Sequence, residues 1–149
     1  DTPGIKAHIC TLMPKDENGK YVHTYKKNGK DTPAEVYVHS KVTIMDDVFT
    51  VISSANLNTR SMQVDTELGI IMEYADVAEG LRKRLWDLHT NKNFAANPDD
   101  MHDYAVAVKT FEAWGKLIEE NKRTQQSNKS PDCALREFYR ADPTVSRSD

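Results

Sequence analysis

The chain has 149 residues, of which 38% are hydrophobic and 29% are charged, and this length is typical of one ordinary domain. Twenty Lys and Arg against 23 Asp and Glu give a net charge of −3, which argues against a protein that coats a polyanion. No apolar run approaches the roughly 20 residues that span a bilayer, and the first residues lack the layout of a signal peptide. Cys10 and Cys133 lie far apart in no ligand spacing, which excludes a disulfide framework and a zinc site.

The first part of the chain predicts little regular structure. Residues 5–14 are typical of a short strand that Pro14 closes. Residues 15–34 contain two Asn-Gly pairs and many charges, so we expect a loop or a long hairpin on the surface.

The middle of the chain predicts a small sheet, because β-branched and aromatic residues are concentrated there. Asp46 and Asp47 predict a tight turn between two paired strands, and residues 53–61 predict a polar loop. The apolar run of the last strand predicts burial on both of its faces. The expected strands are residues 35–39, 42–45, 48–52 and 66–74.

Two helices are expected after the sheet. Asp76 is predicted to cap the first, which ends at about His89, and residues 91–99 form a break before a second helix over 100–122. Each helix has apolar residues at helical spacing on one face. These residues are Val77, Leu81, Leu85 and Leu88 in the first helix, and Tyr104, Val108, Phe111 and Leu117 or Ile118 in the second.

Polar residues interrupt the predicted strands in a pattern that indicates an anion site. His39 and Lys41 are two residues apart, so on a strand both side chains leave by the same face. A lysine can hold a phosphate, and a histidine nitrogen can attack phosphorus or carry a proton near neutral pH. Ser54 and Asn56 have the same spacing and would add hydroxyl and amide donors. Glu67 lies in an otherwise apolar strand, where the ring N–H of a catalytic histidine would be a fitting partner.

These residues together resemble the phospholipase D superfamily. Residues 39–46 reproduce its HxK(x4)D signature, and three further elements follow in register. The resemblance covers roughly residues 35–90, with one departure, because Ser53 stands where the family commonly has Gly. The three further elements are Ser-Ala-Asn at 54–56, Asn-x-Arg-Ser at 58–61 and Asp-Thr-Glu at 65–67.

The resemblance implies a role for each matching residue. His39 is one of two catalytic histidines, and it acts either as the nucleophile or as general acid and then base. Lys41 and Asn56 hold the phosphate, Ser54 supports them, and Glu67 orients the histidine. The resemblance also implies that no metal or other cofactor is needed, since lysines and amides carry the charge that a metal would neutralise.

Asp46, the acid of the signature, is expected to fix the turn rather than to act in catalysis. The implied fold is an α/β/α sandwich, an α/β class in which this chain is the C-terminal lobe, with a mixed sheet flanked by helices. We divide the chain into a catalytic lobe over 1–90, a helical extension over 91–125 and a tail over 126–149.

A complete site in this superfamily combines two HxK motifs, so the resemblance implies an N-terminal partner segment with a second motif. The implied substrate is a phospholipid at a membrane surface. The motif sequences are similar to those of bacterial secreted phospholipase D effectors, including type VI secretion lipases. Secretion or delivery to a target-cell membrane, as a peripheral protein, follows from that subgroup. The alternatives are a cardiolipin synthase-like transferase and a single-motif homodimeric nuclease, and the net charge of −3 disfavours nucleic acid as a partner.

Other conspicuous residues are expected to be structural. Trp86 and Trp114 are predicted to be core residues, and the basic cluster at 82–84 is predicted to lie on the solvent face of a helix. The histidines outside the motif have no companions and are expected to be structural or exposed. They are His8, His23, His89 and His102.

Overall fold

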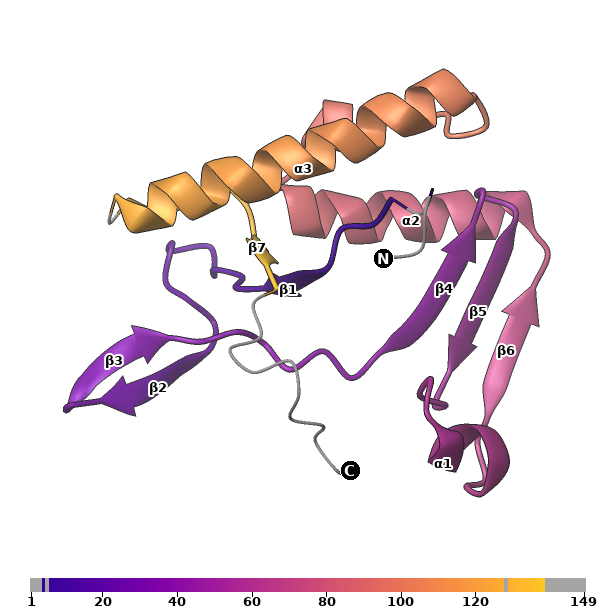
Figure 1. Ribbon diagram of the computed structural model, residues 1–149, viewed down its shortest axis with the longest axis horizontal. Coiled ribbons are helices and arrows are strands. Elements are labelled where there is room, and N and C mark those ends of the chain that lie inside the picture. Colours follow the sequence, from indigo (N-terminus) through magenta and orange to yellow (C-terminus); the bar gives the residue numbers. More distant parts are fainter. Residues whose placement is uncertain (1–3, 5, 128, 139–149) are drawn as a thin grey trace. The chain divides into compact units, whose positions relative to one another are not determined.

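In the computed structural model, residues 4, 6–127 and 129–138 are described. The chain forms two compact units, of which unit 1 comprises Asp1–Val36 with Leu117–Asp149 and unit 2 comprises Tyr37–Lys116 (Figure 1). The last part of the expected tail, 139–149, lies outside the described residues. The domain boundaries at 90 and 125 stay predictions.

Unit 1 contains two small antiparallel ladders. Strand β1 (Cys10–Leu12) pairs with β7 (Leu135–Glu137), and β2 (Thr24–Lys27) pairs with β3 (Lys30–Pro33). The hairpin predicted within 15–34 is confirmed: Asn28 and Gly29, which join its strands, both have the positive φ that a tight turn needs. The segment expected to be a tail contains β7, which is a buried strand rather than an extended end.

Unit 2 contains a three-stranded sheet in the order β4-β5-β6, and both of its ladders are antiparallel. The turn between the first two strands is confirmed, because Asp46 and Asp47 both have positive φ and the Val48 N–H donates to the carbonyl of Met45 at 3.0 Å. Every ladder between named strands in the described part of the chain is antiparallel, where a mixed sheet was expected. The strands are β4 (Lys41–Met45), β5 (Phe49–Ser53) and β6 (Gly69–Met72).

The helices lie close to their predicted positions. The N-cap of helix α2 (Ala75–Thr90) is Tyr74 rather than Asp76, which lies in the first turn, and its C-cap is Asn91 in the left-handed conformation. The expected break holds a short 3-10 helix, η1 (Phe94–Ala96), before α3 (Tyr104–Gln126). Within the expected polar loop 53–61 the short helix α1 (Thr59–Gln63) begins. None of the helices in the described residues is long and apolar enough to cross a membrane.

Helix α2 packs against β4 and β5 and covers one face of the sheet. Thr50 on β5 and Ala78 on α2 are fully buried there. Strand β6 is different: Ile70 and Ile71 are both largely exposed, so the prediction that this strand is buried on both faces is wrong. The expected strand at 35–39 is wrong as well, because those residues are irregular, although the Val36 N–H donates to the carbonyl of Leu12 on β1 at 2.9 Å.

A buried ion pair joins α2 to the β4–β5 turn. The guanidinium of Arg82 contacts the carboxylate of Asp47 at 2.7 Å, and both side chains are 3% exposed. Arg82 also donates to the side-chain oxygen of Asn97 at 2.7 Å and to the carbonyl of Pro98 at 3.0 Å. The prediction that the whole cluster 82–84 faces solvent is therefore wrong for Arg82.

The two tryptophans, predicted to be core residues, are half-buried and contribute to an aromatic cluster in unit 2. The rings of Trp86 and Trp114 meet edge to face with centroids 5.2 Å apart, and the Trp114 indole N–H donates to the carbonyl of Ala96 at 2.8 Å. The His89 ring lies 6.3 Å from that of Trp114, and burial lowers the pKa of His89 below its ordinary value. By contrast Leu88 and Tyr104, which were expected on the packed helix faces, are exposed.

Candidate active site

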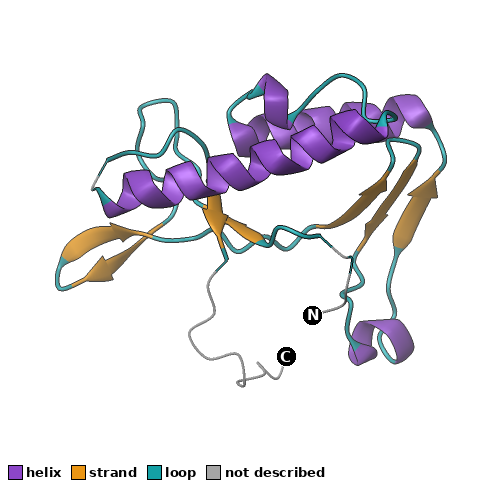
Figure 2. Cartoon of the chain, turned by 45° about the horizontal axis from the view of Figure 1, so that its top comes forward, coloured by secondary structure: helices purple, strands orange, loops and turns teal. Residues whose placement is uncertain are grey.

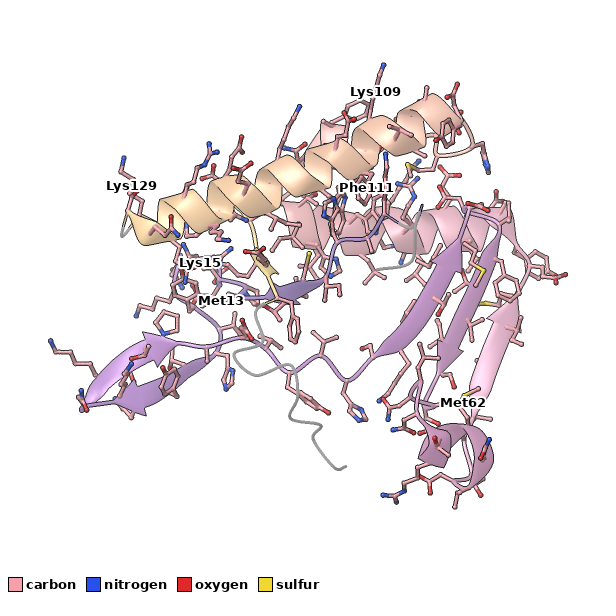
Figure 3. The ribbon with its side chains drawn as sticks, viewed as in Figure 1. Met13, Lys15, Met62, Lys109, Phe111 and Lys129 are labelled. Carbon is pink, nitrogen blue, oxygen red and sulfur yellow. The ribbon has the colours of Figure 1, made fainter. Side chains whose placement is uncertain are left out.

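The predicted site residues gather at one end of the unit 2 sheet. Lys41 begins β4 and pairs with Ser53 at the end of β5, which in turn pairs with Gly69 at the start of β6. His39 precedes the first of these strands, Ser54 and Asn56 follow the second, and Glu67 precedes the third. Figure 2 shows loops and a short helix, α1, at this end of the sheet, and Figure 3 labels Met62 on α1. These connections belong to unit 2.

His39 and Lys41 form a direct contact. The Lys41 ammonium lies 3.0 Å from Nε2 of His39 and donates to the His39 backbone carbonyl at 2.8 Å. Because an ammonium can only donate, Nε2 is the acceptor and the proton of a neutral imidazole is then on Nδ1. The His39 ring is exposed and lies 5.8 Å from the ring of Tyr37. The two side chains lie together, as predicted, but His39 precedes β4 and does not share a strand with Lys41.

Ser54 and Glu67 form the second contact of the site. The Ser54 hydroxyl donates to Oε2 of the Glu67 carboxylate and accepts the N–H of Leu68 at 3.0 Å. Its backbone N–H donates to the carbonyl of Leu68 at 2.9 Å. Since a hydroxyl has one proton, Ser54 can donate to a phosphate only after it releases Glu67.

The surroundings of Glu67 favour its charged form. The hydroxyls of Ser54 and Ser61 lower the pKa of its carboxyl below the ordinary value. The cations of Lys41 and Arg60 lower that pKa further, so the ammonium in contact with His39 also acts electrostatically on Glu67. The two contacts thus belong to one electrostatic cluster.

The loop between β5 and β6 is held by its own polar residues. Asn58 caps helix α1 by accepting the N–H of Ser61 at 2.8 Å, and Arg60 pairs with Asp65 at 2.8 Å. These bonds give Asn58 and Arg60 a structural role in the loop without requiring that they touch a substrate. Asn56 lies in the same loop with its side chain exposed.

Two predicted features differ from the structure. Glu67 is half-buried rather than buried, and in the described residues its hydrogen bonds involve Ser54 and not the ring of His39. Asp46 lies at the opposite end of β4 with its side chain exposed, and the buried acid of that turn is Asp47. The sequence analysis missed the partner of Asp47, although Arg82 lies four residues after the buried Ala78 and so on the packed face of α2.

Comparison with known proteins assigns the family. A family model described as "Cardiolipin synthase, PLD-like domain" matches residues 7–89, more than half of the chain. The chain belongs to the phospholipase D-like family. The matched residues include all of the predicted site, from His39 to Glu67.

Curated relatives support this assignment. A phospholipase D C from Dictyostelium discoideum is 27% identical over 146 aligned residues, which cover 79% of this chain and 9% of that protein. Phospholipase D zeta 1 from Arabidopsis thaliana is 36% identical over 85 residues, 53% of this chain and 7% of that protein. Phospholipase D alpha 4 from the same plant is 39% identical over 69 residues, 42% of this chain and 9% of that protein. This phospholipase D-like chain therefore spans less than a tenth of the length of these relatives, and no solved structure matches it.

The geometry of this phospholipase D-like site suits an anionic ligand. The Lys41 ammonium has three protons, and the contacts with His39 engage two of them. The exposed amide of Asn56 offers two more donors on the neighbouring loop. Among the described residues no group of three His, Cys, Asp or Glu side chains is placed to hold a metal ion, and the metal-free mechanism stays a prediction.

Proposed function

We propose that the chain supplies one HxK site of a phospholipase D-type phosphodiesterase, which cleaves the headgroup phosphodiester of a glycerophospholipid and releases phosphatidic acid. The observation that carries this proposal is the His39–Lys41 contact at the sheet end where Ser54 meets Glu67, in a chain of the phospholipase D-like family. Family membership alone would support a fold, whereas this contact supports phosphate chemistry.

In the proposed reaction a histidine nitrogen attacks phosphorus, and a nitrogen–phosphorus bond forms as the bond to the headgroup oxygen breaks. A second histidine gives its proton to the leaving oxygen and then takes one from the attacking water, whose oxygen bonds to phosphorus as the nitrogen–phosphorus bond breaks and phosphatidic acid leaves. His39 fills one of these two roles. In either role Lys41 has to turn from Nε2 of His39 to the phosphate, which frees the nitrogen lone pair when the anion binds.

The neighbourhood of the site supports a lipid substrate. Four large apolar side chains from the adjoining loop and from α1 are exposed beside the polar groups, and one of them, Leu57, is fully exposed. Apolar surface around a phosphate site suits an amphiphile at a membrane surface better than it suits a nucleic acid backbone. The four side chains are Leu57, Met62, Val64 and Leu68.

A second HxK(x4)D motif completes the site in this proposal, because the mechanism needs two histidines. The sequence resemblance favours an N-terminal segment of the same protein as its source. The proposed role as a secreted bacterial effector, and with it the proposed location, rests on the sequences of the motifs. The relatives described above come from Dictyostelium discoideum and Arabidopsis thaliana.

The proposal is tested by offering the complete gene product a phospholipid in vesicles and a nucleic acid side by side. We expect phosphatidic acid and free headgroup from the vesicles, no cleavage of the nucleic acid, and loss of the lipid activity in His39→Ala. Cleavage of the nucleic acid alone, or an unchanged lipid activity in His39→Ala, would overturn the proposal.

Phosphatidyl transfer is the second candidate, because the matching family model carries the description of a cardiolipin synthase domain. Both reactions share the phosphohistidine, and they differ in whether water or an alcohol accepts the phosphatidyl group. Adding a primary alcohol should divert product from phosphatidic acid to the phosphatidyl alcohol. Phosphatidic acid alone at high alcohol concentration would argue for hydrolysis without a shared intermediate.

A further inference from the structure

Ser53, which replaces the glycine common in the family, makes two hydrogen bonds at the end of β5. Its hydroxyl accepts the N–H of Ala55 at 2.9 Å, so the side chain closes a turn over its own backbone two residues on. The same hydroxyl donates to the carbonyl of Leu68 at 3.4 Å. It therefore bridges the loop that carries Ser54 and Asn56 to the segment that carries Glu67.

The room for this hydroxyl comes from the residue opposite. Gly69 pairs with Ser53 across the β5–β6 ladder, and a Cβ atom at Gly69 would lie 3.2 Å from the Ser53 hydroxyl oxygen and 3.3 Å from its Cβ. Facing Cβ atoms in antiparallel sheets are ordinarily about 4.5–5.5 Å apart. The two strands thus approach more closely here than two side chains permit.

We propose that Ser53 and Gly69 are a matched pair of positioning residues that sets the geometry of the phosphate-binding loop. This inference rests on the proposed function for its kinetic consequences and on the hydrogen bonds alone for its structural ones. Ser53 holds the turn, and Gly69 allows the hydroxyl to stay between the strands. Neither residue contacts the substrate; they act through Ser54, Asn56 and Glu67.

The pair predicts a specific pattern of tolerance. With Ser53 in place, Gly69→Ala has to push β6 away by a few tenths of an ångström, which separates Ser54 from Glu67. Removing the Ser53 side chain removes the obstacle, so a chain with Gly at position 53 should accept Ala at position 69. The effects of the two substitutions are then not additive, as expected for residues in contact.

The structural part is tested by amide hydrogen exchange at Ala55. In Ser53→Ala, which keeps the Cβ and removes the acceptor, we expect exchange of the Ala55 N–H to accelerate about fivefold or more, as for the loss of one hydrogen bond. Exchange in the strand pair β1–β7 of unit 1 should not change. An unchanged rate at Ala55 would overturn the role of the hydroxyl, whether or not the protein proves to be a phosphodiesterase.

The kinetic part is tested by a cycle of variants in the complete gene product, with phospholipid vesicles as substrate. We expect Gly69→Ala to lower kcat about tenfold with a smaller change in KM, the scale of a sub-ångström displacement at a site. Adding Ser53→Gly should restore kcat to within about twofold of the Ser53→Gly single variant, and adding Ser53→Ala should restore less, because its Cβ remains.

The matched control is Gly80→Ala on α2, where the nearest atom that a new Cβ meets is the end of the Arg84 side chain at 3.9 Å. This variant should leave kcat unchanged. If Gly69→Ala with Ser53→Gly is no better than Gly69→Ala alone, the pairing is wrong. If the wild-type protein cleaves no phosphodiester while Ala55 exchange responds as expected, the proposed function fails and the structural pairing stands.

Discussion

The two ends of the unit 2 sheet use charge in opposite ways. At the β4–β5 turn, Asp47 and Arg82 are buried, and the guanidinium is engaged by a carboxylate, an amide oxygen and backbone carbonyls. At the other end, Lys41 and His39 are bonded to each other and remain accessible to solvent. Buried charge requires full pairing, whereas charge that is to bind a ligand has to keep donors unused.

The largest effect that this comparison predicts is the loss of turnover in His39→Ala. General acid–base or nucleophilic groups contribute up to about 10⁴-fold in rate, so we expect a loss of that size with an unchanged melting temperature. Steady-state hydrolysis of phospholipid vesicles and calorimetry measure the two quantities. The exposed His102→Ala is the control and should keep its full rate; a melting temperature lowered only in His39→Ala would give that histidine a structural role.

The reverse result is expected at the buried end. Arg82→Ala leaves the Asp47 carboxylate buried without its partner, which should reduce the free energy of unfolding by about 3–5 kcal/mol. Urea denaturation measures the loss. Arg84→Ala, two residues away on the exposed side of α2, should cost less than about 0.5 kcal/mol. An equal loss in the free energy of unfolding for the two variants would mean that the buried ion pair does not stabilise this end of the sheet.

An intermediate effect is expected for the proposed phosphate ligands. Lys41→Ala and Asn56→Ala should each lower kcat about 100-fold, the scale for one preorganised donor that stabilises developing negative charge. Lys109→Ala, at an exposed lysine of α3, serves as the control. An Asn56→Ala enzyme with normal kcat would remove that amide from the site.

The smallest effect concerns pH. The pKa of Glu67 is lowered in the folded protein, so the carboxylate stabilises the fold above its unfolded pKa of about 4.5, and this contribution is lost as the pH falls through the folded value. Ser54→Ala removes the first cause of the shift and should raise the pKa of Glu67. An NMR titration of the Glu67 carboxyl measures this change. The same pKa in Ser54→Ala and in the wild type would show that the Ser54 hydroxyl does not lower it.

Local patterns were sufficient for the features that depend on neighbouring residues. The turn at Asp46 and Asp47 and the contact between His39 and Lys41 follow from residues within a few positions of each other, and both predictions are confirmed. The register of the sheet end then follows from the hairpin. Closeness in the sequence is therefore enough to bring His39 and Lys41 together, although only Lys41 lies on a strand.

Features set by distant segments were not predicted. In the sequence, Arg82 is part of a basic run that predicts a solvent-exposed helix face, because its partner Asp47 lies 35 positions away. Strand β7 has only three residues, and it is a strand because β1 pairs with it from the other end of the chain. The apolar run of β6 predicts burial, but in the described structure α2 packs against β4 and β5 and leaves Ile70 and Ile71 exposed.

The hydrogen bonds between Ser54 and Leu68 have a consequence for how this family can diversify. They join the two ends of the β5–β6 loop that contains α1, here called the excursion, so residues 57–65 form a loop whose ends are held together. Because the entropy of closing a loop grows only slowly with its length, insertions next to Leu57 or Val64 and exchanges of the exposed Leu57, Met62 and Val64 would cost little stability and would leave the contact between Ser54 and Glu67 in place. The excursion is thus a natural place for substrate preference to evolve independently of the chemistry.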